Sequence, residues 1–223
     1  RETFLEKVKA LVHKNDALLI FDETITGFRY SLGGAQELFN VMPDIATFGK
    51  GMANGYPLSA VVGSNKIMHL VEDIFFSGTF GGETLSLAAA NSVIDKYEDS
   101  QVIDHLDSIG QYLIEGLNHL IESHGLKEHF AVSGHPSWSF LHFKQHGEYS
   151  HCDIQTFFLQ EMIKRGKLTL GTHNLSFSHK KNEIDELLSS YQEVLPMIKN
   201  NIDNNSLLEN LECELLKPLF KVR

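Results

Sequence analysis

Two carboxylates and a lysine occupy positions from which side chains commonly take part in chemistry. Asp22 and Glu23 directly follow a continuous apolar run at residues 17–21, the pattern of a strand buried on both faces of a parallel sheet. Lys50 lies between two glycines and follows residues 44–48, which are expected to form a second short strand. In open α/β sheets ligands bind outside the carboxyl ends of the strands, so these side chains are predicted to lie at a binding edge.

Three interpretations fit this arrangement of Asp22, Glu23 and Lys50. An aspartate that ends a strand can simply cap a loop, and an apolar run followed by Asp-Glu is also typical of the magnesium-binding strand of a P-loop ATPase. The lysine favours a third interpretation. In pyridoxal phosphate chemistry a lysine forms a Schiff base with the cofactor, and a carboxylate keeps the pyridine nitrogen protonated so that the ring can accept electrons. Asp22 and Lys50 are therefore the candidate catalytic residues.

Short motifs extend the pattern from residue 21 to residue 80. In chain order they are Phe21-Asp22-Glu23, Thr26-Gly27-Phe28-Arg29, Gly33-Gly34-Ala35-Gln36, Pro43-Asp44, Gly49-Lys50-Gly51, Gly55-Tyr56-Pro57-Leu58 and Ser77-Gly78-Thr79-Phe80. Their order and spacing resemble those of the class III pyridoxal-phosphate-dependent aminotransferases. The resemblance is closest to the glutamate-1-semialdehyde aminotransferase (aminomutase) branch, and residues 171–176 also resemble the small domain of that family.

The resemblance implies a fold, a cofactor and a set of site residues. The fold would be α/β, that of the fold type I pyridoxal-phosphate-dependent transferases, with part of a large domain built on a mainly parallel sheet and a small C-terminal α/β domain. Lys50 would carry pyridoxal 5'-phosphate and move the substrate proton, and Asp22 would pair with the ring nitrogen. Thr24, where the family usually has valine, would contact the ring. Thr79 would reach the phosphate of a cofactor bound in the neighbouring subunit, so a homodimer with a shared active site is expected.

The resemblance covers essentially the whole chain but only the second half of a family member. Residue 1 is Arg1 rather than methionine, and a helix expected at residues 1–13 leads directly into the first strand. We therefore expect a preceding parallel strand to be missing. We also expect a complete cofactor site to need residues before Arg1, so that the 223-residue piece alone would bind the cofactor poorly.

The resemblance, together with the helices and strands expected from hydrophobic periodicity, implies three parts of the chain. Residues 1–99 are predicted to form the C-terminal part of the cofactor-binding large domain, residues 100–200 a small α/β domain with a long connecting helix, and residues 201–223 a helical tail. Further elements are expected as helices at 66–71, 85–97, 101–124, 153–164, 183–198 and 206–216, strands at 58–62, 139–143 and within 171–177, and a polar spacer at 200–205.

Several polar residues have open roles. Glycines and hydroxyl groups before the helix at 85–97 could bind an anion at the helix N-terminus, or the helix could simply be N-capped, which the spacing favours. Glu83 stands there, where the family commonly has asparagine. Arg29 could contact a carboxylate or phosphate, although a salt bridge at the base of the loop is the favoured interpretation. His173 and Asn174 lie in a stretch that faces the substrate entrance in the family.

Composition argues against several classes of partner. A formal net charge of -10 disfavours nucleic acid or an anionic membrane as the main partner, and no apolar run approaches the roughly 20 residues of a membrane-spanning helix. The chain has only two cysteines, Cys152 and Cys213. So few cysteines are typical of a protein in a reducing cytoplasm and do not suggest a disulfide framework. No metal site is predicted, and surface or hydrogen-bonded positions are expected for the clustered histidines His135, His142, His146 and His151.

The leading functional hypothesis is a transaminase that moves an amino group between an amine or amino acid and an aldehyde or keto substrate. A glutamate-1-semialdehyde 2,1-aminomutase, which moves an amine between adjacent carbons of one molecule, would use the same residues. Two more distant alternatives are a non-catalytic homologue and a nucleotide binder of the ATPase type. For the last, the sequence contains no G-x-x-x-x-G-K-[ST] motif. The identity of the substrate is not predicted.

Overall fold

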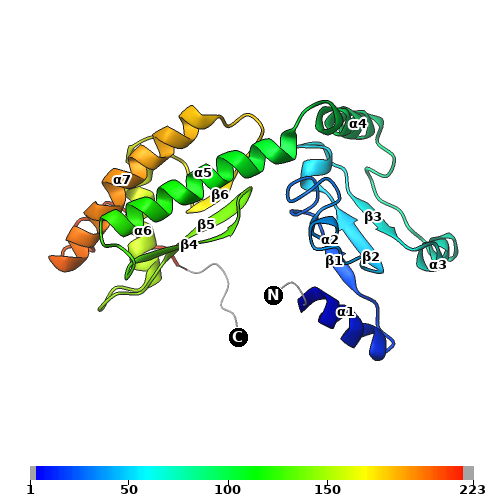
Figure 1. Cartoon of the computed structure of the whole chain (residues 1–223), viewed down its shortest axis with the longest axis horizontal. Helices are drawn as coiled ribbons and strands as arrows, with labels where there is room; N and C mark the ends of the chain where they lie inside the picture. The colour runs from blue at the N-terminus through cyan, green and yellow to red at the C-terminus, as the bar shows by residue number, and fades with distance from the viewer. Residues whose placement is uncertain (1–3, 218–223) are drawn as a thin grey trace. The chain divides into compact units, whose positions relative to one another are not determined.

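The computed structural model describes residues 4–217, and the chain divides into two compact units, residues 1–104 and residues 105–223 (Figure 1). Among the described residues, each unit contains one three-stranded sheet. The first three residues of the helix expected at 1–13, and the end of the expected tail, lie outside the described residues.

The sheet of the first unit has the strand order β1-β2-β3, formed by Ile20–Asp22, Ile45–Phe48 and Ala60–Gly63. β1 and β2 are parallel, whereas β2 and β3 are antiparallel. In the register of the parallel pair, Asp22 lies opposite Thr47. Paired residues of neighbouring strands present their side chains on the same face of a sheet, so Asp22 and Thr47 point to the same side.

Helices and short helical turns connect these strands. They are α1 Phe4–Lys14, α2 Ala35–Leu38, the 3₁₀ helix η1 Lys50–Met52, α3 Asn65–Met68, the 3₁₀ helix η2 His69–Asp73 and α4 Thr84–Asp99. The helix predicted at 85–97 is confirmed, and the one predicted at 66–71 is divided between α3 and η2. A small core forms where η1 meets α4: Met52, Ala53 and Ala90 are buried, and Phe28, Phe48, Leu58 and Ala60 pack against them.

The burial predicted for the apolar segments of this unit is wrong. The strand expected at residues 17–21 begins at Ile20, which keeps 57% of its surface exposed. The strand expected at 58–62 is β3, where Val61 is 47% exposed. α1 has the predicted amphipathic pattern, yet none of its residues is buried. The apolar faces are present, but the described chain supplies too few side chains to cover them.

The second unit is an antiparallel sheet with three long helices. The strand order is β4-β5-β6, formed by Phe130–His135, Trp138–Phe143 and Thr172–Asn174. The helices are α5 Val102–Ser123, α6 His151–Lys164 and α7 Lys181–Asp203. Both predicted strands and all three helices are confirmed, whereas β4 was not predicted.

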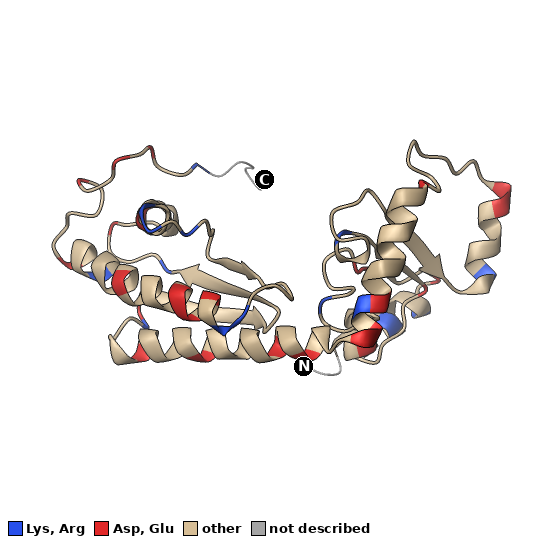
Figure 2. Ribbon diagram, turned by 90° about the horizontal axis from the view of Figure 1, so that it is seen from above, with Lys and Arg blue, Asp and Glu red and all other residues tan. Residues whose placement is uncertain are grey.

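Side chains from all three helices and β4 fill the core of the second unit. Its largest fully buried side chains include Leu113, Leu117, Phe130, Ile154, Phe158, Met162, Tyr191, Leu195 and Ile198. Figure 2 shows acidic residues spaced along α5, and residues of both charges along α7. On α7 the pairs Lys181–Asp185 and Lys199–Asp203 are four residues apart, the spacing at which opposite charges stabilise a helix.

The helix predicted at 206–216 is wrong, and so is the polar spacer before it. α7 continues through the expected spacer to Asp203, and the described residues that follow it form turns and extended chain. Side chains of α6 explain the extended path. Gln160 Nε2 donates to the Asn210 carbonyl at 3.0 Å, and Gln160 Oε1 accepts from the Glu212 amide at 2.6 Å. These backbone groups are therefore satisfied without a helix.

Candidate active site

Asp22 and Lys50 follow neighbouring parallel strands. Asp22 is the last residue of β1, and Lys50 begins η1 two residues after the end of β2. Both lie at the carboxyl edge of this pair, where open α/β sheets bind ligands. Lys50 is exposed and has a φ of 39°, in the left-handed region, which costs a residue with a side chain about 1–2 kcal/mol. Such strain is often stored at functional sites.

The Asp22 carboxylate is exposed and held by two threonines. Its Oδ1 accepts hydrogen bonds from the Thr24 amide at 3.0 Å and from Thr47 Oγ1 at 3.2 Å. Hydrogen bonding by the side chain and backbone of Thr24, and then by Thr47, lowers the pKa of Asp22, and the charge of Lys50 acts in the same direction. A fixed negative charge therefore lies at this edge at neutral pH.

Thr24 approaches the segment that carries Lys50. A Cβ atom added at Gly49 would lie 3.4 Å from the Thr24 methyl carbon, an ordinary van der Waals contact. The structure thus brings together three of the predicted site residues, Asp22, Thr24 and Lys50. Their chemistry fits pyridoxal phosphate: an amine that can carry an aldehyde, an ionised carboxylate that can hold a ring N–H, and a methyl group that can cover a ring face.

Glu23, the neighbour of Asp22, has a different environment. It is 1% exposed, and its two carboxylate oxygens accept hydrogen bonds from the amides of Ala35 and Gln36, each at 2.8 Å. The Thr26 hydroxyl donates to the same carboxylate. Both oxygens of Glu23 are therefore engaged by the first two amides of α2, which argues against a magnesium-binding Asp22-Glu23 pair.

Gly34 allows the loop to approach Glu23. Its φ is 82°, a value that favours glycine, and any Cβ at this position would collide with the Glu23 carboxylate. The sequence motif Gly33-Gly34 therefore has a structural explanation. The buried carboxylate anchors the loop, and the adjacent exposed carboxylate is left at the sheet edge.

Glu83 is the N-cap of α4. Its carboxylate accepts from the amides of Leu85 at 2.8 Å and Ser86 at 2.7 Å, and from the Ser86 hydroxyl at 2.5 Å. Hydrogen bonds from the Ser86 side chain and from these amides lower the pKa of Glu83. The N-capped helix that the spacing favoured is confirmed, because the Glu83 carboxylate binds the free amides of this helix end.

Thr79 is the fourth predicted cofactor-binding residue. It sits in an exposed turn before α4, and no hydrogen bond joins it to Asp22, Thr24 or Lys50 within residues 4–217. The expected phosphate contact of Thr79 is to a cofactor in a neighbouring subunit, so its role stays a prediction.

Arg29 is half-buried among aromatic side chains. Burial lowers the pKa of Arg29, and the phenols of Tyr97 and Tyr30 oppose this effect. Tyr97 also donates a hydrogen bond to the Phe28 carbonyl and so ties the Arg29 loop to α4. Tyr97 and Thr47 were not predicted as site residues, because their contacts are to residues distant in the chain.

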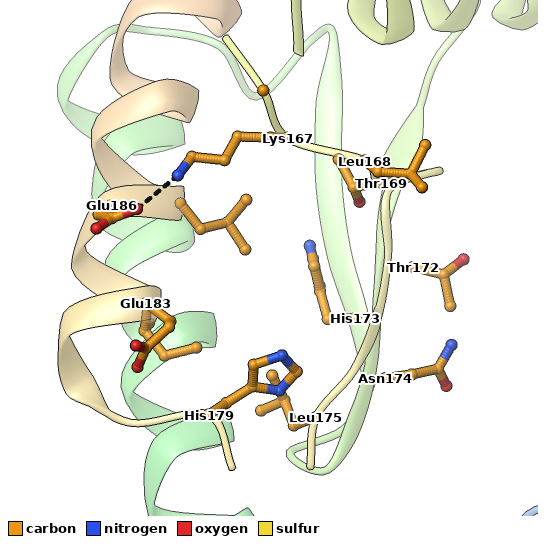
Figure 3. Close-up of a pocket in the computed structure, with 13 residues that line it drawn as sticks. Lys167, Leu168, Thr169, Thr172, His173, Asn174, Leu175, His179, Glu183 and Glu186 are labelled. Atoms are coloured by element: carbon orange, nitrogen blue, oxygen red, sulfur yellow. Dashed lines mark hydrogen bonds and ion pairs between the residues drawn. The ribbon is translucent and has the colours of Figure 1, made fainter. Parts of the chain in front are cut away.

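His173 is a buried histidine of the second unit. It is 4% exposed, its Nδ1 lies 2.9 Å from Ser139 Oγ, and its Nε2 lies 2.8 Å from the Tyr191 hydroxyl. Burial lowers the pKa of His173 to about 4. Figure 3 shows its ring directed into the space between β6 and α7, where it lines a pocket of about 430 Å³. Both ring nitrogens are engaged, whereas the neighbouring Asn174 is exposed.

The remaining candidate groups have ordinary surroundings. Ser133 lies 2.6 Å from His142, and the rings of His129 and His146 pack with centroids 4.3 Å apart. Within residues 4–217 no group of three or more His, Cys, Asp or Glu side chains could hold a metal ion. Cys152 and Cys213 are free cysteines. No helix in that part of the chain is long and apolar enough to cross a membrane.

Comparison with known proteins identifies the family. The family described as Aminotransferase class-III matches residues 1–134. A glutamate-1-semialdehyde 2,1-aminomutase of Methanothrix thermoacetophila is 37% identical over 202 residues, which cover 85% of this chain and 46% of that protein. A 3-aminobutyryl-CoA aminotransferase of Cloacimonas acidaminovorans is 31% identical over 199 residues, covering 88% of this chain and 48% of that protein.

A solved structure shows the same fold. The pyridoxal phosphate form of the FumI protein of Sphingopyxis sp. MTA144 superposes with a TM-score of 0.79 at 24% identity, covering 91% of this chain and 48% of that one. The fold predicted from the sequence, that of fold type I transferases, is thereby confirmed. The chain belongs to the class III aminotransferase family. It spans about half the length of the curated relatives it matches.

Proposed function

We propose that the protein acts as a pyridoxal-phosphate-dependent transaminase, moving an amino group between an amine or amino acid and an aldehyde or keto substrate. The observation that supports this most strongly is the convergence of Asp22, Thr24 and Lys50 at the carboxyl edge of β1 and β2. The family assignment adds independent support. The proposal applies to the protein in its native length, since the chain covers about half of its relatives.

Each residue has a distinct proposed role. When bound, pyridoxal phosphate supplies an electron sink that makes the carbon next to the substrate nitrogen acidic. Lys50 Nζ would hold the cofactor and would move the proton at that carbon. Asp22, whose pKa is lowered by its threonine donors, would remain ionised and hold the proton on the ring nitrogen. The Thr24 methyl group would cover one face of the ring.

A glutamate-1-semialdehyde 2,1-aminomutase is the second candidate, favoured by the similarity to relatives of that name. It would use the same three residues. The two activities differ in whether the protein releases the carbonyl product of the first half of the reaction. A transaminase releases a keto acid or aldehyde when an amine is supplied alone, whereas an aminomutase retains it.

We also propose a homodimer with a shared active site and a cytoplasmic location. The dimer is supported by the exposed apolar stretch around Thr79, in which Phe75, Phe76 and Phe80 keep most of their surface accessible. Such a patch is unusual on a monomer and typical of an interface. The free thiols of Cys152 and Cys213 support a reducing compartment.

Amine transfer by purified native-length protein tests the proposal. With pyridoxal phosphate, an amino donor and a panel of keto acids and aldehydes, we expect transfer by the wild type. Replacing Lys50 by alanine should reduce the rate of amine transfer roughly 10³-fold or more, because the same amino group is proposed to hold the cofactor and to transfer the proton. Lys66→Ala, in the exposed α3, is the matched control and should retain activity. Equal rates for Lys50→Ala and the wild type would exclude this mechanism.

A further inference from the structure

Thr47 makes a contact with the candidate site that the sequence motifs do not explain. It lies on β2 directly opposite Asp22 in the parallel register, and its hydroxyl is 3.2 Å from Asp22 Oδ1. The Thr24 amide, at 3.0 Å, reaches the same oxygen. Both of these hydrogen bonds fall on Oδ1, and the Thr24 side chain is a further donor to the same carboxylate.

This pattern of donors would orient the carboxylate. Two donors from different segments, one on β2 and one just after β1, fix the position of Oδ1 and therefore the rotation of the whole group about its Cβ–Cγ bond. The strand position of Thr47 also matters. A side chain on a paired strand is held by the sheet, so its hydroxyl is a more rigid donor than one in a mobile loop.

We propose that Thr47 is a positioning residue, which holds Oδ1 of Asp22 so that Oδ2 and the negative charge face the ring nitrogen of pyridoxal phosphate. The inference rests on the proposed function. Thr47 itself need not touch the cofactor or substrate. Its hydroxyl stabilises the ionised form of Asp22 and keeps the carboxylate in one orientation, which favours the protonated ring nitrogen.

The test compares Thr47→Val, which removes the hydroxyl at nearly constant shape, with Thr47→Ser, which keeps it. The native-length protein is titrated with pyridoxal phosphate at a series of pH values, and the visible absorbance of the bound cofactor gives the dissociation constant. We expect Thr47→Val to weaken binding about fivefold, the effect of one lost hydrogen bond, and Thr47→Ser to stay within about twofold of the wild type. Thr172→Val, a half-buried strand threonine of the second unit, is the matched control.

The pH dependence separates positioning from a merely structural role. Binding that needs ionised Asp22 weakens as pH falls through the pKa of that carboxyl. Loss of the Thr47 donor raises the pKa of Asp22. The pH midpoint of the loss of cofactor binding should therefore move to higher pH in Thr47→Val and should equal that of the wild type in Thr47→Ser. A defect that comes only from poor folding would not move the midpoint.

Each outcome decides one claim. If the wild type binds pyridoxal phosphate and Asp22→Asn does so poorly, but Thr47→Val matches the wild type in both affinity and midpoint, Thr47 does not position Asp22. The same conclusion follows if Thr47→Ser fails to restore a defect of Thr47→Val. If the wild type binds no pyridoxal phosphate at all, the proposed function itself fails, and the role of Thr47 fails with it.

Discussion

The two units of the chain differ in how completely they bury their apolar residues. The second unit, residues 105–223, surrounds its sheet with three long helices and has many side chains with no exposed surface. The first unit, residues 1–104, has a small core around Met52 and Ala90, while apolar side chains of α1, β1 and β3 stay accessible. Yet the first unit carries all the candidate catalytic residues. The proposed chemistry would thus lie in the unit with the smaller core.

The largest expected effect on stability lies in the core of the second unit. Leu195→Ala removes a side chain with no exposed surface and should cost about 2–5 kcal/mol of unfolding free energy. Leu11→Ala on α1 of the first unit removes a side chain that is 62% exposed and should change the unfolding free energy by less than about 0.5 kcal/mol. Urea unfolding is monitored by Trp138, the single tryptophan, which reports on the second unit, and by far-UV circular dichroism, to which the helices of both units contribute. Equal effects of the two substitutions would remove the contrast between the units.

A smaller loss is expected from Glu23, the buried carboxylate of the first unit. Glu23→Ala leaves the amides of Ala35 and Gln36 without their acceptor and should cost roughly 2–3 kcal/mol. Hydrogen exchange of residues 26–38 should become faster. Asp22→Asn is the control: it should leave exchange in this loop unchanged while it impairs cofactor binding. If both substitutions loosen the loop, the separation of a structural from a chemical carboxylate is incorrect.

His173 should make the second unit acid-sensitive. Its pKa is about 4 in the folded chain and near 6.5 when unfolded, so between these values the unfolded chain binds the extra proton. Stability should therefore fall as pH drops from about 6.5 to about 4, by up to roughly 3 kcal/mol. Trp138 unfolding curves at several pH values measure this loss. In His173→Gln the loss of stability should become smaller, leaving the part due to His129 and His135, whose pKa values burial also lowers. In His119→Gln, a change on the exposed surface of α5, the full loss should persist. Identical pH dependence in all three proteins would contradict this assignment.

Sequence patterns predicted the structural features that depend on neighbouring residues better than those that depend on residues distant in the chain. The strand ends at Asp22 and before Lys50 follow from apolar runs and glycines within a few residues, and they were predicted correctly. The exposure of Ile20 and Val61 was not predicted correctly, because it depends on which side chains cover the sheet and not on the apolar runs in the sequence. The helix expected at 206–216 failed for a similar reason, since Gln160, about fifty residues earlier, binds its backbone.

The candidate site shows the same limit. Asp22 and Lys50 could be selected by residue type and spacing, and Thr24 by the family resemblance. The different environments of Asp22 and Glu23 could not be predicted. They depend on the amides of Ala35 and Gln36, which the fold brings to Glu23. Thr47 was missed because its importance comes from strand register, which places it opposite Asp22. A residue that acts by positioning another side chain is hard to recognise from the few residues around it in the sequence.

The most direct test of the central claim is to locate the cofactor on the chain. Native-length protein is incubated with pyridoxal phosphate and reduced with borohydride, and the modified peptide is identified by mass spectrometry. The placement of the chemistry at the edge of β1 and β2 predicts a visible absorbance band and a single reduced adduct on Lys50. An adduct on another lysine such as Lys66 or Lys167, or no adduct at all, would contradict it.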